Sequence, residues 1–170
     1  MNLFLFRRYY GNYEFSTIIR HKHFIFLFIW TDFKKSLTHQ IIMAAKRMMF
    51  KMEFIFRASP TIVYQFLTNP ACLVRWFCDE VDISANVYTF FWDGDEQVAT
   101  LVEDWEDELL RFEWEDAPSS SEYLEFNISK SGITEETVLN ISDFCDLNDE
   151  KNARMLWESQ IAQMKVATGG

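Results

Sequence analysis

The sequence NDEKNARMLWESQIAQMKV, residues Asn148–Val166, predicts one amphipathic helix near the C-terminus. Its apolar side chains recur every three or four residues, and charged and amide side chains occupy the opposite side. The apolar stripe consists of Ala153, Leu156, Trp157, Ile161 and Met164. Asn148 is placed to cap the first turn, and the residues from Ala167 onwards are expected to fray. Because Trp157 buries more apolar area than its neighbours, a broad sheet must receive this helix, either as a core element or as the lid of an internal cavity.

The composition predicts one acidic domain preceded by a segment of different character. A chain of 170 residues, 49% of them apolar, can build one sizeable core. Residues 1–45 contain six basic and two acidic residues, whereas residues 46–170 contain ten basic and 24 acidic residues, a net charge of −14. Such a domain would be repelled by nucleic-acid phosphates and anionic lipids, so neither is an expected partner. No apolar stretch is long enough to span a membrane and no secretory signal is recognisable, so a cytoplasmic location is expected.

Residues 1–47 are predicted to be a poorly organised N-terminal extension. The first 45 residues contain 11 aromatic side chains but neither strand alternation nor a capped helix. In one interpretation, the start of the chain is mis-assigned and translation begins at one of the methionines Met43, Met48, Met49 and Met52. In the other, the extension is an interfacial anchor whose aromatic wedges and lipid-facing cations are Phe24, Phe26, Phe28, Trp30, Arg20 and Lys22.

From residue 48 the sequence predicts an α+β domain with the order strand, two short helices, six strands and a long helix. Phe50–Arg57 alternates like a strand, Ser59-Pro60 begins a short helix, and Asn69-Pro70 ends it and begins a second. The six further strands are predicted at Cys78–Ser84, Val87–Trp92, Gln97–Trp105, Leu109–Glu115, Glu122–Lys130 and Ile133–Phe144. Short polar connections, with positive φ expected at Gly94 and Gly132, favour antiparallel neighbours. A seven-stranded antiparallel sheet should therefore curl around the long helix over residues 48–167, with 168–170 as a disordered tail.

The segment RASPTIVYQFLTNPACLVRWFCDEV, residues Arg57–Val81, resembles the opening of START-like domains of the SRPBCC superfamily, in particular the branch related to activators of Hsp90 ATPase. The similarity rests on the Ser-Pro helix start, the Leu-Thr-Asn-Pro break and Trp76 followed by an acidic turn. Three further segments, FFWDGDEQVATL, LNISDF and LWESQI, are similar to a compact bacterial group of START-like proteins. The resemblance implies a helix-grip fold. It also implies a cavity that holds lipids, polyketides or other apolar molecules in relatives, or a protein-contact role in the Hsp90-activator branch.

The predicted domain lacks the residues of common catalytic and metal sites. All three histidines of the chain lie within residues 1–47. Their absence from the domain excludes histidine-dependent nucleophilic catalysis and histidine metal sites there. Cys72, Cys78 and Cys145 lack zinc-site spacing and are expected to be reduced, packed thiols, and no phosphate-binding glycine motif is present. We therefore expect no catalytic residue, no metal and no cofactor.

Two groups of carboxylates have alternative interpretations. Around Trp105 lie Glu103, Asp104, Glu106, Asp107 and Glu108, which are interpreted as solvated charges that discourage edge-to-edge strand pairing. Asp143 shares strand parity with Leu139 and Ile141, so its side chain is expected to point inward. It could serve as a general base, but a buried hydrogen-bonding role at the strand end is the preferred interpretation, and Arg57 or Arg75 could meet its charge.

The inward-facing apolar residues form the candidate ligand site. They are Phe66, Trp76, Phe90, Trp92, Leu101, Phe112, Trp114, Phe126, Leu139, Ile141, Trp157 and Ile161. Side chains of this size either line a cavity or fill it. The leading hypothesis is a non-enzymatic domain that binds an apolar, lipid-like molecule between the sheet and the last helix. The alternative is a protein-interaction module of the Hsp90-activator type, which a filled core and an exposed apolar patch would favour. A third hypothesis, a cyclase or hydrolase, would need convergent polar groups inside the cavity.

Overall fold

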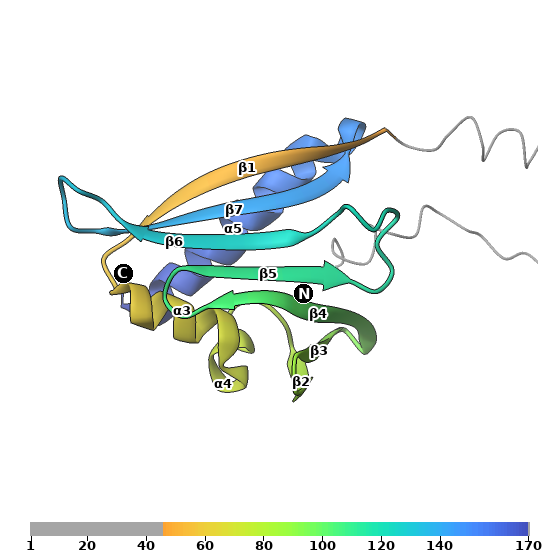
Figure 1. The fold of residues 1–170 in the computed structure, drawn as a ribbon, viewed down its shortest axis with the longest axis horizontal. Helices are drawn as coiled ribbons and strands as arrows, with labels where there is room; N and C mark the ends of the chain where they lie inside the picture. Colours follow the sequence, from red (N-terminus) through yellow and green to blue (C-terminus); the bar gives the residue numbers. More distant parts are fainter. Residues whose placement is uncertain (1–45, 170) are drawn as a thin grey trace, which may run out of the picture.

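The computed structural model describes residues 46–169, which form one seven-stranded antiparallel sheet with helices packed on one face (Figure 1). The strands are β1 (Arg47–Phe56), β2 (Glu80–Ser84), β3 (Val87–Trp92), β4 (Asp95–Trp105), β5 (Leu109–Trp114), β6 (Leu124–Lys130) and β7 (Thr137–Asp146). Their spatial order is β1-β7-β6-β5-β4-β3-β2. The chain therefore meanders from β2 to β7, and β1 closes the sheet beside β7. This is the predicted helix-grip architecture.

Two short helices connect β1 to β2, as the sequence predicts. Helix α3 spans Pro60–Thr68, and α4 spans Pro70–Leu73. Ser59 Oγ accepts a hydrogen bond from the amide of Ile62 at 3.4 Å, and Asn69 Oδ1 accepts one from the amide of Ala71 at 2.9 Å. Each proline stands at the first helical position, where its missing amide proton costs no hydrogen bond. Asn69 thus ends one helix and begins the next.

The long helix α5 spans Glu150–Thr168 and lies behind the sheet in Figure 1. The prediction that Asn148 caps it was wrong, because Leu147–Asp149 forms a 3₁₀ turn first. The amide of Leu147 donates to Lys46 O at 2.8 Å, so the β1–β7 pairing continues past the strand end and delays the helix. At the other end, the helix does not fray after Val166. It continues to Thr168, and Gly169 closes it at φ 100°.

Other predicted strand starts were also wrong, including those of β2 and β7. Strand β2 begins at Glu80, because the amide of Cys78 bonds to Leu73 O at the end of the helical region. Strand β7 begins at Thr137, and Ile133 is 95% exposed in the preceding loop. In that loop Glu135, not Gly132, adopts positive φ.

A β-bulge in β4 decides which residues face outward at the end of that strand. Leu101 pairs with Phe112 on the inner face, but the next pair is Glu103 with Arg111. Two residues of β4 therefore oppose one of β5, which reverses the side-chain parity. Trp105 consequently faces outward.

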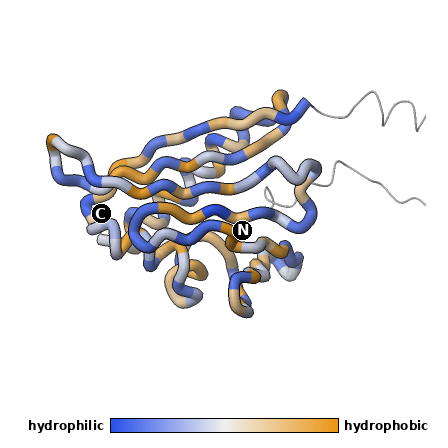
Figure 2. The backbone as a smooth tube through the Cα atoms, in the orientation of Figure 1, coloured by the Kyte–Doolittle hydropathy of each residue, from blue (hydrophilic) through white to orange (hydrophobic). Residues whose placement is uncertain are grey.

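The core lies between the sheet and the helices. Figure 2 shows hydrophobic and hydrophilic residues alternating along the central strands, as expected for a sheet with one covered face. The buried stripe of α5 includes Trp157, Ile161 and Met164, all at most 2% exposed. The α5 stripe and the inner face of the sheet therefore form one core.

The predictions for the N-terminal extension concern residues 1–45, which lie outside the described residues. Among residues 46–169, no helix has the length and apolar character needed to cross a membrane. Strand β1 begins at Arg47, one residue before the predicted domain boundary.

Candidate functional site

The structure brings the predicted ligand-site residues together on the inner face of the sheet. Ten of the twelve are buried in one continuous core, and the exceptions, Leu101 and Trp114, are half-buried against it. Trp157 lies between two aromatic rings, with its ring centroid 6.2 Å from that of Phe77 and 5.8 Å from that of Phe126. The aromatic side chains therefore contact one another across the space where a ligand would bind.

A small cavity lies inside this core in the described part of the chain. Its volume is about 10 Å³, and it is lined by Leu67, Leu73, Trp76, Phe77, Phe90, Phe112, Trp114, Leu124 and Phe126. Pockets for drug-sized ligands measure roughly 300–1,000 Å³. Five of the twelve predicted residues line this cavity, and the other four lining residues, Leu67, Leu73, Phe77 and Leu124, were not included in the predicted site. The aromatic residues fill this interior and leave only a small void.

Two buried polar groups in the core have no hydrogen-bond partner among the described residues. Trp114 lines the cavity, and its indole Nε1 has no acceptor. The side-chain oxygen Oε1 of Gln160 has no donor. The other buried indoles among the described residues are satisfied, since Trp76 Nε1 donates to Phe66 O at 2.9 Å, Trp92 Nε1 to Phe77 O at 2.6 Å and Trp157 Nε1 to Asp143 Oδ2 at 2.8 Å. Buried polar groups are normally paired, so among the described side chains that line this cavity the Trp114 indole is the hydrogen-bond donor left for an entering molecule.

Asp143 is buried and points inward, as its strand parity predicts. It is 2% exposed, and its Oδ2 accepts a hydrogen bond from Trp157 Nε1 at 2.8 Å. Of the two arginines considered as partners, Arg75 donates to Ala167 O at 3.2 Å. Asp143 therefore connects β7 to α5. Asp143 is not among the residues that line the small cavity.

A buried ion pair that the sequence analysis did not identify holds β1 to the start of β6. Glu122 is 5% exposed, and Arg47 bonds it through Nε at 3.0 Å and through Nη2 at 2.5 Å. Arg47 Nη1 also donates to Asp146 Oδ1 at 3.0 Å. Burial would lower the pKa of Arg47, but the hydrogen bonds to the two carboxylates outweigh it and raise that pKa. Arg47 is therefore always charged, and it neutralises Glu122.

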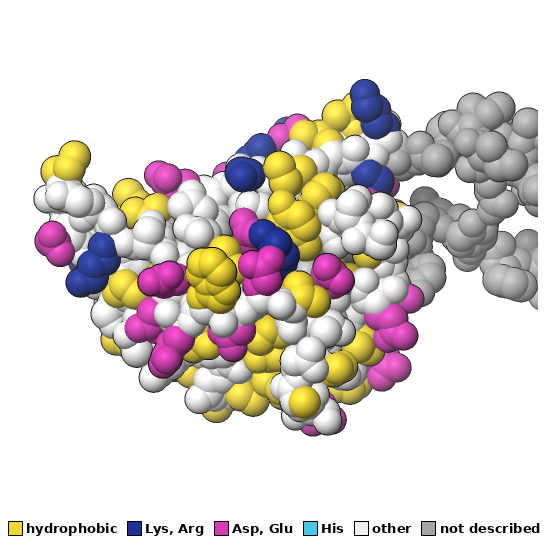
Figure 3. All heavy atoms as spheres, in the orientation of Figure 1, with side chains coloured by type: hydrophobic (Ala, Val, Ile, Leu, Met, Phe, Trp, Pro, Cys, Tyr) yellow, Lys and Arg dark blue, Asp and Glu magenta, His cyan; other side chains and the backbone are white. Residues whose placement is uncertain are grey.

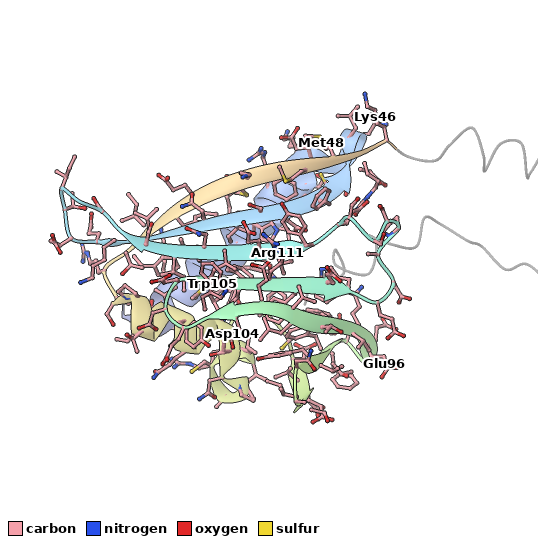
Figure 4. All side chains as sticks on the ribbon, in the orientation of Figure 1. Lys46, Met48, Glu96, Asp104, Trp105 and Arg111 are labelled. Carbon is pink, nitrogen blue, oxygen red and sulfur yellow. The ribbon has the colours of Figure 1, made fainter. Side chains whose placement is uncertain are left out.

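The outer face of the sheet carries an arginine that bonds two acids and lies over an aromatic ring. Arg111, labelled in Figure 4, bonds Glu103 and Glu125 and lies 4.7 Å above the ring of Tyr123. The Tyr123 ring in turn contacts Phe144 at 5.4 Å. The hydrogen bond to Glu125 is the main cause that raises the pKa of Arg111. Figure 3 shows this face, where hydrophobic side chains lie beside basic and acidic ones.

An open groove of about 710 Å³ lies at the end of this face, and we call it the acidic groove. It is lined by Ser59, Pro60, Thr61, Trp105, Glu106, Asp107, Glu108, Leu109, Asn127, Ile128, Ser129 and Lys130. Trp105 is 60% exposed, and it lies at the end of β4 in Figure 4. Asp107 Oδ2 accepts a hydrogen bond from Thr61 Oγ1 at 2.6 Å, whereas Asp107 Oδ1 is buried without a partner among the described residues. The interpretation of these acids as fully solvated charges is therefore incomplete.

All three cysteines are free, and the titration of Cys78 has a consequence for stability. Burial raises the pKa of the Cys78 thiol to about 12, with a smaller effect of Asp79. In the unfolded chain a cysteine titrates near pH 8.5. Above that pH the unfolded chain releases this proton while the folded chain keeps it, so stability must fall as the pH rises toward about 12, by roughly 1.4 kcal/mol per pH unit.

We therefore expect the urea midpoint to fall between pH 8 and pH 10, and the fall to be smaller in Cys78→Ala. The variant removes the titrating thiol, so its slope against pH is the informative quantity, whatever its absolute stability. The pKa of Tyr88 is also raised by burial, but phenols titrate near pH 10 and contribute mainly above this window. Equal pH slopes for the two proteins would show that Cys78 does not titrate as described.

Comparisons with known proteins agree with the fold. A family model described as a START-like superfamily domain matches residues 43–170. No curated protein matches the chain. The solution structure of BfR322 from Bacteroides fragilis is 27% identical, covers 74% of this chain and 93% of its own, and superposes with a TM-score of 0.54.

Two further solved structures show the same fold at lower identity. The Aha1 dimer from Colwellia psychrerythraea is 12% identical, with coverage of 71% of this chain and 96% of its own and a TM-score of 0.61. Protein MLL2253 from Mesorhizobium loti is 13% identical, with coverage of 69% and 94% and a TM-score of 0.57. Because the family model spans most of the sequence, including every described strand and helix, this chain belongs to the START-like superfamily.

Proposed function

We propose that this domain is a protein-binding module that uses the outer face of its sheet. The observation that carries the proposal is the filled interior, where the cavity measures about 10 Å³ against the several hundred that a bound lipid needs. The outer face meanwhile exposes apolar side chains. Trp105 is 60% exposed, Ile55 50% and Met49 42%. Exposed apolar groups on a folded domain commonly mark an interaction surface.

The chemistry of the outer face supports this proposal. Tryptophan, tyrosine and arginine dominate the binding energy of protein interfaces, and Trp105, Tyr123 and Arg111 all lie on or beside this face. Arg111 is held by Glu103 and Glu125, so little side-chain entropy remains to be lost on binding. A protein of the same fold, the Colwellia Aha1, forms a dimer in its solution structure. The fold is therefore compatible with protein contacts.

The test is cross-linking mass spectrometry on the full chain recovered from its native source with its partners. Lys51 and Lys130 are exposed on the sheet side, whereas Lys151 is exposed on α5. Binding through the outer face predicts partner cross-links to Lys51 or Lys130 and few to Lys151. Cross-links confined to Lys151, or a stoichiometric apolar molecule in the native mass spectrum, would overturn the proposal.

A second candidate function, binding of an apolar molecule that opens the core, is favoured by the unpaired Trp114 indole. A ligand with an apolar body and one oxygen acceptor would occupy the enlarged cavity and accept the Trp114 Nε1 proton. The rearrangement must move closely packed aromatic rings, so weaker binding than in a preformed pocket is expected.

On addition of decanoate, the indole NMR signal of Trp114 should therefore shift more than those of Trp92 and Trp157. These two serve as internal controls because neither lines the cavity and their N–H groups are already bonded to Phe77 O and Asp143 Oδ2. Trp114→Phe keeps an aromatic ring but removes the donor, and it should weaken decanoate binding. Identical, small shifts of the three indoles would count against this second function.

A further inference from the structure

We propose that the acidic groove binds a short basic segment of a partner protein, with an arginine or lysine stacked on Trp105 and paired with Asp107. This inference rests on the proposed function and identifies where on the outer face the partner docks and what chemistry it presents. The groove has a volume of about 710 Å³, so it accommodates several side chains of an extended segment.

The local fold presents Trp105 to the groove. The β-bulge after Leu101 reverses the parity of β4, and Trp105 then pairs with Leu109 on the outer face at the hairpin end. Its indole remains 60% exposed. The face of an indole ring attracts a guanidinium or ammonium group, and tryptophan is the most favourable aromatic side chain for this contact.

The charges on the groove wall select a cation. Glu106, Asp107 and Glu108 lie in the β4–β5 turn, whereas Lys130 is the one basic side chain among the lining residues. Asp107 is held in place by Thr61, and its buried Oδ1 has no donor among the described residues. The hydrogen bond from Thr61 keeps the Asp107 carboxylate at the groove, where its negative charge attracts an incoming cation.

The opposite wall suits a peptide backbone. Asn127 and Ser129 are exposed on β6 and carry an amide and a hydroxyl, which can donate to and accept from a main chain. Anionic ligands such as phosphates and carboxylates are disfavoured by the acidic turn. A second copy of the domain is disfavoured as well, because residues 46–170 carry ten basic against 24 acidic residues.

The test uses a fluorescein-labelled peptide of four Arg-Ala repeats and the full chain, with binding followed by fluorescence anisotropy at 0.15 M salt. Trp105→Ala and Asp107→Asn should each weaken binding by about fivefold, which corresponds to about 1 kcal/mol. Asparagine tolerates the left-handed backbone of Asp107, at φ 64°, and it keeps an acceptor for Thr61. The matched control is Glu96→Gln, which removes one exposed charge at the opposite end of β4 (Figure 4) and should change affinity less than twofold.

The outcomes separate this inference from the proposed function. Equal losses from Asp107→Asn and Glu96→Gln, with no effect of Trp105→Ala, would show diffuse charge attraction and overturn the acidic groove as the site. Absence of peptide binding at millimolar concentration would overturn it too. In either case, partner cross-links to Lys51 would leave the proposed function standing, whereas cross-links confined to Lys151 would overturn that function itself.

Discussion

Replacing Trp157 with alanine is expected to lower the free energy of unfolding by about 3–5 kcal/mol, the usual cost of truncating a buried large aromatic residue. Trp157 is 2% exposed, contacts Phe77 and Phe126, and donates its indole proton to Asp143. It therefore combines the largest apolar contact of α5 with a hydrogen bond to the sheet. Because small domains are stable by only about 5–15 kcal/mol, the loss should be evident as a large drop in the urea midpoint monitored by circular dichroism.

Two further substitutions separate the apolar contact of Trp157 from its hydrogen bond. Trp157→Phe keeps a ring but removes the indole donor to Asp143, so a loss of about 1–3 kcal/mol is expected. The matched control is Met155→Ala on the exposed side of α5, where Met155 is 57% exposed and a change within about 0.5 kcal/mol is expected. If Trp157→Ala and Met155→Ala had similar effects, α5 would not be fixed to the sheet in the way described.

Side-chain direction was the most predictable feature of the fold. The 3.6-residue period places Trp157 and Ile161 on the covered side of α5, and strand alternation places Asp143 inward, whatever these side chains contact. The ends of elements were less predictable. The sequence around Asn148 is compatible with a helix, and the sequence around Ile133 is compatible with a strand. Hydrogen bonds of neighbouring segments, or their absence, decide where the helix and the strand start.

The functional site was only partly predictable because it depends on three-dimensional packing. Periodicity identified residues that face inward, but the volume left between Phe90, Phe112 and Trp114 depends on how their rings interlock. The bulge that turns Trp105 outward has no signature in the alternation of β4. The same holds for Arg47 and Glu122, which are 75 residues apart and meet only in the folded chain. Such pairings require coordinates.

Arg47→Met is expected to lower the free energy of unfolding by about 3–5 kcal/mol, the cost of leaving one member of a buried ion pair uncompensated. The reason is Glu122, whose side chain is 6% exposed and receives three hydrogen bonds from the Arg47 guanidinium. Methionine fills a similar volume but cannot donate a hydrogen bond. Asp146, the second partner, has a side chain that is 41% exposed, so water can replace the arginine there. Urea denaturation at neutral pH measures the effect.

A double-mutant cycle attributes this loss to the buried carboxylate. Adding Glu122→Leu to Arg47→Met removes the unpaired charge, so the double variant should be more stable than Arg47→Met alone, by about 2 kcal/mol or more. Arg111→Met is the matched control, because Arg111 bonds two carboxylates on the outer face with its side chain 30% exposed, and a loss of at most about 1 kcal/mol is expected there. Equal losses from Arg47→Met and Arg111→Met would show that burial does not distinguish the Arg47–Glu122 pair from the Arg111 ion pairs. The absence of any recovery on adding Glu122→Leu would show the same. The link from β1 to the start of β6 would then contribute little to the free energy of unfolding.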